Sequence, residues 1–219
     1  MILDKKIAHG DVIVLDGATG TEIERLGGKM DAAAWCAVAN MNDPEKVQQV
    51  HEAYMRAGAD VITTNTFATC RHVLAGVGLD NDTVAINQQA VKLARKARDV
   101  VAPSRPVAIA GSMSNTVAWQ PGFISPDPRF IPSERQETAN YREMANTLAD
   151  SGVDFLILEM MLDIDHASRA LEAAVATGLP VWVGVSCSLE DDGAVVGWDL
   201  ATQGRITADH TPPLPLPLD

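Results

Sequence analysis

The chain has 219 residues, 47% of them hydrophobic and 21% charged, which is the composition of a globular protein and excludes a disordered or fibrous one. Its length fits one domain with a substantial core. The formal net charge of -12 disfavours nucleic acid and anionic membrane surfaces as partners, because both require clustered lysine and arginine.

The sequence also bears on location and on redox chemistry. The longest apolar runs fall short of the roughly 20 residues of a membrane-spanning helix. The N-terminal segment MILDKKIAHGD carries charges where a secretory signal has its apolar core, so we predict a cytoplasmic protein with no membrane partner. Cys36, Cys70 and Cys187 are widely spaced without a CxxC pair, and each is predicted to be a small buried hydrophobic residue.

Short aliphatic segments alternate with longer amphipathic ones along the chain. The short segments are typical of strands buried on both faces of a parallel sheet and cover residues 12–15, 61–64, 107–110, 155–158 and 181–185. The longer segments predict helices over residues 44–57, 84–101, 133–149 and 165–176. This alternation predicts an α/β fold, either a doubly wound sheet or a (β/α)8 barrel.

Two junctions repeat the same pattern, RAGADVITTN at residues 56–65 and DSGVDFLILE at residues 150–159. In each, a helix ends at glycine, an aspartate follows two residues later, and an aliphatic strand ends at a polar residue. Both candidate architectures bring the C-terminal ends of parallel strands to one face, where ligands bind. Polar residues at the strand ends are therefore candidates for a shared site.

Asp16 follows the first predicted strand and opens the turn DGATG. A lone ionised carboxylate at the end of an apolar strand needs a partner or a proton, so we predict that Asp16 points into the shared pocket. The alternative is a turn aspartate bonded to its own backbone. The turn matches no phosphate-binding pattern, and its glycines favour close approach of the backbone to a small ligand.

Glu159 supplies a second carboxylate, at the end of FLILE. Two carboxylates in one pocket suit either acid and base catalysis or recognition of a substrate ammonium group. The structural alternative is an ion pair between Glu159 and an arginine at a helix start. The segment TTNTF at residues 63–67 adds hydroxyl and amide groups at another strand end.

Four segments resemble the homocysteine S-methyltransferases, the family of betaine-homocysteine methyltransferase and of the homocysteine module of methionine synthase. They are LDGATGTE at residues 15–22, DPEKVQQVHEAYMRAGADVITTNTF at 43–67, AGSMS at 110–114 and GVDFLILEMM at 152–161. The resemblance extends from about residue 11 to about residue 198. It implies a (β/α)8 barrel in which a zinc-bound homocysteine thiolate takes a methyl group from a small donor to give methionine.

The resemblance also implies roles for particular residues. Asp16 and Glu159 are expected to hold the homocysteine amino group, and Gly17, Asn65 and Thr66 to line the site. The family's zinc is expected on cysteines that follow later strands, whereas this sequence carries about five βα units. We therefore predict a partial barrel over residues 1–198, an extended or disordered tail over 199–219, and no zinc ligand in this chain.

Two further consequences complete the predictions. Unpaired strand edges and an uncovered inner face favour association, so we predict a homo-oligomer. Two alternatives to methyl transfer stay open: a non-catalytic homocysteine-binding or assembly protein, and a metal-independent barrel lyase or isomerase that uses Asp16 and Glu159 as acid and base.

Overall fold

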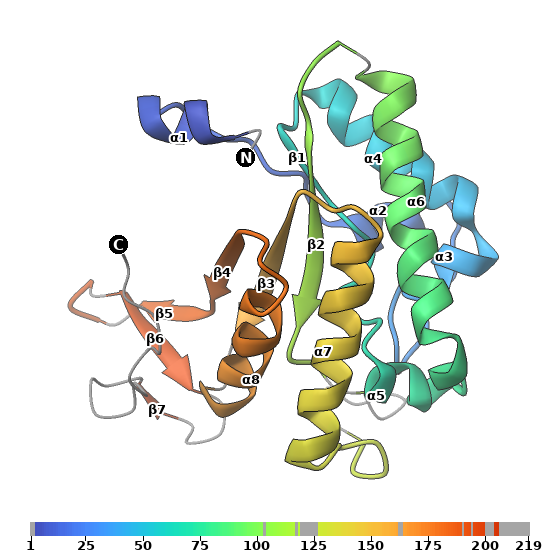
Figure 1. The fold of residues 1–219 in the computed structure, drawn as a ribbon, viewed down its shortest axis with the longest axis vertical. Coiled ribbons are helices and arrows are strands. Elements are labelled where there is room, and N and C mark those ends of the chain that lie inside the picture. Colours follow the sequence, from blue (N-terminus) through green and yellow to red (C-terminus); the bar gives the residue numbers. More distant parts are fainter. Residues whose placement is uncertain are drawn as a thin grey trace.

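The core of the computed structural model is a parallel sheet of four strands that follow one another in the sequence. The structure describes residues 3–102, 104–116, 118, 127–161, 164–189, 191–193, 195–199 and 204–205. The strands are β1 (Val61–Thr63), β2 (Ala108–Ser114), β3 (Phe155–Met161) and β4 (Val181–Val185), hydrogen-bonded in that order (Figure 1). Strands that pair in chain order through helical crossovers form the wall of a (β/α)8-type barrel, so the predicted fold class is confirmed.

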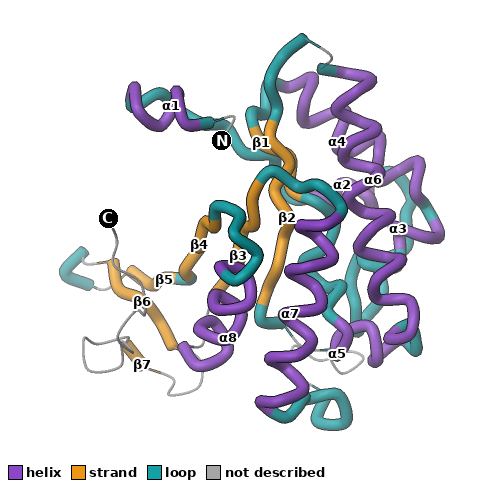
Figure 2. Tube along the Cα trace, viewed as in Figure 1, coloured by secondary structure: helices purple, strands orange, loops and turns teal. Residues whose placement is uncertain are grey.

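Four long helices cover the outer face of this sheet (Figure 2). They are α4 (Pro44–Ala57), α6 (Thr83–Val101), α7 (Glu134–Asp150) and α8 (Ile164–Val175), each within one or two residues of its predicted bounds. Pro44 stands at the first helical position of α4, and Gly58 ends it with a φ of 110°, a conformation that favours glycine. Shorter helices occupy the connections: α1 (Asp4–His9), α2 (Thr19–Arg25), α3 (Ala39–Asn42), α5 (Arg71–Leu74), η1 (Ala75–Val77) and η2 (Asp80–Asp82).

The two faces of the sheet follow from the two-residue period of a strand. Ile62, Ile109 and Leu156 face outward and pack with the helices in the main hydrophobic cluster. Their neighbours Ala108 and Phe155 face inward, in a smaller cluster at the N-terminal ends of the strands. Towards the C-terminal ends of the strands, the inward-facing side chains become polar. The polar strand ends therefore lie on the inner side of the barrel wall.

The repeated aspartates of the two junctions perform the same structural task. Asp60 Oδ2 accepts a hydrogen bond of 3.0 Å from the amide of Val14, and Asp154 Oδ2 accepts one of 2.7 Å from the amide of Ile109. Each carboxylate thus satisfies an amide of the preceding strand segment. A cation balances each charge, Lys6 at 2.8 Å from Asp60 and Arg98 at 3.0 Å from Asp154. The two aspartates directly precede β1 and β3, so the repeat in the sequence stabilises the N-terminal ends of the strands.

The structure corrects several predicted elements. The first predicted strand is reduced to a single parallel bridge between Leu15 and Val61, because the amide of Val14 bonds to the side chain of Asp60 instead of a neighbouring strand. The other predicted strands are present, with β2 and β3 extending three or four residues beyond their predicted ends.

A second, antiparallel sheet was not predicted. It contains β5 (Cys187–Leu189), β6 (Val195–Asp199) and β7 (Gly204–Arg205), and it lies beside β4 on the side away from α4 and α6 (Figure 2). Apart from residues 199 and 204–205, the predicted tail lies outside the described residues. Among the helices of the described residues, none has the length and apolar character needed to cross a membrane.

Candidate functional site

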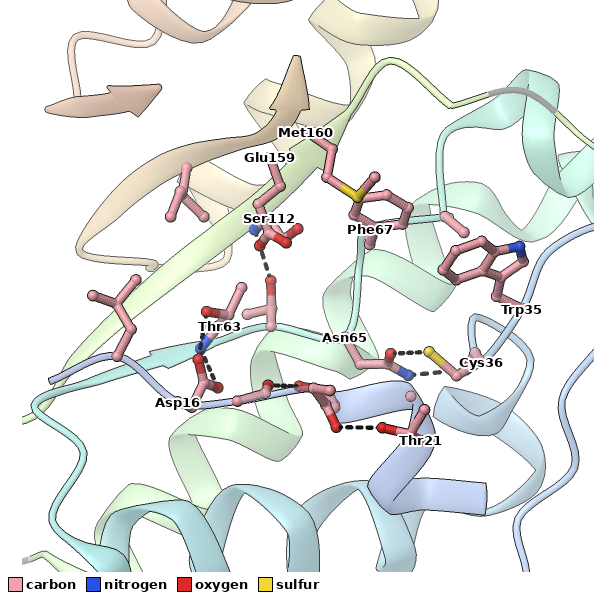
Figure 3. A pocket seen from close by; sticks show the side chains of 18 of the residues that line it. Asp16, Thr21, Trp35, Cys36, Thr63, Asn65, Phe67, Ser112, Glu159 and Met160 are labelled. Atoms are coloured by element: carbon pink, nitrogen blue, oxygen red, sulfur yellow. Dashed lines mark hydrogen bonds between the residues drawn. The ribbon is translucent and has the colours of Figure 1, made fainter. Parts of the chain in front are cut away.

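A cavity of about 520 Å³ opens at the C-terminal ends of the strands, where the polar inner rows end (Figure 3). The turn after Leu15, the end of β1, the loop before α3 and the ends of β2 and β3 form its walls. Its lining residues are Leu15, Asp16, Gly17, Ala18, Thr19, Gly20, Thr21, Met30, Trp35, Cys36, Thr63, Thr64, Asn65, Phe67, Ala68, Ser112, Ile157, Glu159 and Met160.

Asp16 lies in this cavity, as predicted, with its carboxylate held against β1. Its two oxygens accept hydrogen bonds from the amide of Thr63 at 2.8 Å and from the Thr63 hydroxyl at 2.7 Å. Burial raises the pKa of Asp16 from 3.8 to about 6, the Thr63 hydrogen bonds oppose this shift, and the charge of Glu159 adds to it. A carboxylate with a pKa raised in this way inside a cavity is typical of a functional residue.

Glu159 belongs to β3 and lines the same cavity. Burial raises the pKa of Glu159 above its ordinary value, and the nearby Ser112 hydroxyl partly offsets the shift. The following residue, Met160, has a φ of 54°, and the pairing of β3 with β4 shifts register between Leu158 and Met161. A bulge of this kind redirects side chains and is common next to active sites. Here it leaves Glu159 directed into the cavity (Figure 3).

No basic side chain pairs with either carboxylate among the residues that the structure describes. The predicted alternative of an arginine partner for Glu159 is therefore not observed in that part of the chain. Two half-buried acids in one cavity are costly when both are ionised, and the charge of Glu159 already raises the pKa of Asp16. A cationic ligand group between them removes this cost.

Ser112 is a third polar group of the cavity, and it belongs to the segment AGSMS at residues 110–114. The side chain is 1% exposed, and its hydroxyl has no partner in normal hydrogen-bond geometry among the described residues. It nevertheless lies close enough to Glu159 to favour the ionised carboxylate. A buried hydroxyl without a full hydrogen bond is available to a ligand.

Gly17 forms the floor of the cavity beside Asp16, and its lack of a side chain has a direct cause. A Cβ atom at this position would lie 2.8 Å from the hydroxyl oxygen of Tyr54, which reaches across from α4. The Tyr54 hydroxyl donates a hydrogen bond of 3.4 Å to the carbonyl of Ala18. A side chain at residue 17 would therefore require the Tyr54 ring to move away from the turn.

The other two predicted site residues differ in placement. Asn65 lines the cavity, but its side-chain amide bonds to Cys36 and Asn40 behind the wall. Thr66 is fully buried and does not line the cavity, because its hydroxyl donates a hydrogen bond of 2.7 Å to the carbonyl of Ser112. The contacts of these residues with a substrate remain predictions.

Sequence reasoning missed an aromatic wall of the cavity. Trp35 and Phe67 stack with ring centroids 5.6 Å apart, and Met160 lies beside Phe67 (Figure 3). Trp35 has a φ of 50°, a left-handed conformation that costs a bulky residue roughly 1–3 kcal/mol. The segment AAAWCA shows no period that would have indicated this residue.

The thiols of the described residues do not fit a zinc ion. Cys36 lines the cavity, but burial raises the pKa of its thiol to about 11, and the thiol donates a hydrogen bond to Asn65. Cys70 is buried outside the cavity lining, and Cys187 is exposed. The prediction that Cys187 is buried is wrong, because β5 leaves the parallel sheet that the helices cover. In the described ranges, no three His, Cys, Asp or Glu side chains converge on a possible metal position.

Comparison with known proteins gives a consistent picture. The sequence profile of the family "Homocysteine S-methyltransferase" matches residues 13–209. Selenocysteine methyltransferase of Astragalus bisulcatus is 29% identical over 179 residues, covering 73% of this chain and 53% of the relative. Homocysteine S-methyltransferase of Escherichia coli (strain K12) is 29% identical over 180 residues, covering 80% and 57%. Betaine–homocysteine S-methyltransferase 1 of Sus scrofa is 29% identical over 184 residues, covering 81% and 60%.

The chain thus spans between about half and three-fifths of the length of these curated relatives. Among solved structures, the homocysteine methyltransferase of Escherichia coli in its metallated form superposes with a TM-score of 0.72 at 25% identity. The match covers 92% of this chain and 72% of that protein. Because the family profile spans most of its residues, the chain belongs to the homocysteine S-methyltransferase family.

Proposed function

We propose that the cavity binds the amino-acid end of homocysteine and that the protein transfers a methyl group from a small donor to the homocysteine thiol. The observation that supports this proposal most strongly is the pair Asp16 and Glu159. Both carboxylates line one cavity, both have raised pKa values, and neither has a basic partner among the described residues. The ammonium group of an α-amino acid supplies the missing positive charge and several hydrogen-bond donors.

The aromatic wall suits the other end of the substrate. Trp35, Phe67 and Met160 present apolar and polarisable surface, which favours a sulfur atom and the methyl groups of a donor. An acidic cavity with an aromatic wall also favours a positively charged donor, such as a sulfonium or a quaternary ammonium compound. One of the relatives is named as a betaine–homocysteine S-methyltransferase, and betaine is a donor of this class.

Methyl transfer forms a bond between the homocysteine sulfur and the methyl carbon, breaks the donor's bond to that carbon and releases the thiol proton. The family match favours this reaction over the lyase or isomerase alternative. Zinc activation of the thiol would require ligands beyond the described residues, so we assign to the described residues only the binding and orientation of the substrate.

Isothermal titration calorimetry tests the binding step. We expect homocysteine to bind and 4-mercaptobutanoate, which lacks the amino group, to bind at least tenfold more weakly. Asp16→Asn and Glu159→Gln should each remove most of this discrimination. Glu52→Gln, in the ion pair of Glu52 with Arg56 on α4 and outside the cavity lining, is the matched control and should leave this discrimination unchanged. Equal affinity for the two thiols would contradict the proposal.

Turnover is tested separately, by methionine formation from homocysteine and S-methylmethionine with zinc supplied. Methionine formation that depends on Asp16 supports the transferase. Homocysteine binding without any methionine formation would instead establish the non-catalytic alternative.

The predicted homo-oligomer remains a prediction. Val12 is 79% exposed at one edge of the described sheet, and Val185 is 52% exposed at the other, so apolar surface is available for association. Light scattering on the purified chain decides this point, and a monodisperse monomer would contradict it.

A further inference from the structure

The strained conformation of Trp35 needs a restraint from both sides of the residue. On the N-terminal side, Asp31 and Trp35 exchange two backbone hydrogen bonds of 2.8 and 2.9 Å, which close a tight loop. The Asp31 side chain also accepts a hydrogen bond of 2.7 Å from the amide of Ala33. This loop brings the indole against Phe67 at the cavity wall (Figure 3).

On the C-terminal side, the restraint is a cluster of Cys36, Asn40 and Asn65, which we call the amide cluster. The Asn65 side-chain amide donates hydrogen bonds to the Cys36 carbonyl at 2.9 Å and to Asn40 Oδ1 at 3.1 Å. In return, the Cys36 thiol donates to Asn65 Oδ1 at 2.8 Å, and Asn40 Nδ2 donates to the Asn65 carbonyl at 2.8 Å.

The amide cluster is closed to solvent and internally satisfied. Asn40, Asn65 and Cys36 are 0%, 4% and 8% exposed. A fully satisfied buried network holds one geometry, whereas a partly satisfied one leaves buried donors and acceptors unpaired. The cluster therefore has one favourable arrangement, and that arrangement fixes the residue next to Trp35.

We infer that Asn40 is a positioning residue for the cavity. Asn40 does not line the cavity itself, since it lies on α3 behind the wall. It orients Asn65, Asn65 holds both the carbonyl and the thiol of Cys36, and the preceding peptide then carries Trp35 in its left-handed conformation. The ligand side of this inference depends on the proposed function, but the restraint on Trp35 does not.

The restraint is tested first without any ligand, in a chain that keeps Trp35 as its only tryptophan after Trp119, Trp182 and Trp198 are changed to Phe. We expect Asn40→Leu to raise the acrylamide quenching constant of Trp35 at least twofold, because the loop loses its fixed position. Asn87→Leu is the matched control, since Asn87 is equally buried and its side chain forms three hydrogen bonds, two with Thr69 in the segment before α5 and one with the carbonyl of Thr83 on α6. It should change the constant by less than 1.5-fold.

A second pair of variants keeps the test valid if Asn40→Leu does not fold, as judged by far-UV circular dichroism. Cys36→Ala removes the donor to Asn65 Oδ1 and should raise the quenching constant of Trp35. Cys36→Ser keeps a donor at this position, so its quenching constant should stay close to that of the chain with Cys36. Unchanged quenching in both Asn40→Leu and Cys36→Ala, or an equal rise in Asn87→Leu, would overturn the inference.

The ligand arm measures homocysteine affinity in the same variants with all tryptophans present. We expect at least a fivefold loss in Asn40→Leu and less than a twofold loss in Asn87→Leu. Equal losses in the two variants would show a general effect of destabilisation and would also refute the positioning role. If the unmodified chain binds no homocysteine, the proposed function fails, and the quenching of Trp35 alone decides the role of Asn40.

Discussion

We predict that the Asp16 carboxylate, which is proposed to bind the ligand, lowers the stability of the ligand-free protein. Its pKa rises from 3.8 to about 6 on folding, chiefly through burial. At about 1.4 kcal/mol per pKa unit, the ionised carboxylate costs the folded state about 3 kcal/mol. Because the folded pKa is the higher one, this cost is absent below pH 3.8, grows as the pH rises, and is complete above pH 6.

Asp16→Asn isolates this effect. The neutral amide can keep both contacts with Thr63, accepting from the amide and donating to the hydroxyl oxygen, and it carries no charge to bury. We expect the stability of the variant relative to the unmodified protein to increase by about 2 kcal/mol between pH 4.5 and pH 7.5. The same variant should lose homocysteine binding, which is the usual exchange of stability for function at a binding site.

Urea denaturation followed by circular dichroism at several pH values measures this difference. A second background tests the cause, because the charge of Glu159 contributes to the shift. In Glu159→Gln the advantage of Asp16→Asn should become smaller. An advantage that stays constant from pH 4.5 to pH 7.5 would refute the reasoning, since it would mean that the pKa of Asp16 does not change on folding.

Three further substitutions have defined expectations. His51 is fully buried without a hydrogen-bond partner for either ring nitrogen among the described residues, and burial lowers its pKa to about 4. The unfolded chain therefore binds a proton below pH 6.5 that the folded chain rejects, and His51→Leu should add about 1–3 kcal/mol of stability at pH 7 and more at pH 5 in urea titrations. A stabilisation that does not grow on acidification would contradict this account. Asp154→Ala should cost about 2–3 kcal/mol by the same method, because it leaves the buried amide of Ile109 without its acceptor; no loss would show that another group replaces the carboxylate. Gly17→Ala should lower the melting temperature and weaken homocysteine binding through its contact with Tyr54, and Tyr54→Leu in the same chain should restore the melting temperature if that contact is the cause.

The sequence by itself was sufficient for the fold class and for the prediction that Asp16 and Glu159 face one cavity. Continuous aliphatic strands and amphipathic helices are local patterns, and glycine and proline mark their ends, so α4 and β4 have their predicted bounds. The meeting of Asp16 and Glu159 also follows from a general property, because parallel strands bring their C-terminal ends to one face. The repeated aspartates were visible in the sequence, but their amide partners were not.

Only the tertiary structure decided how the cavity wall is built. Asn65 stands at a strand end and was predicted to line the site. It does line the cavity, but its amide bonds to Asn40, which is 25 residues away in the sequence. The left-handed conformations of Trp35 and Met160 are likewise absent from any local pattern, since neither residue prefers them. Such conformations persist where packing between segments that are distant in the sequence holds the backbone and offsets its strain. The positions of polar groups along the chain are a local property, whereas the partners that those groups find are set by the way the layers pack.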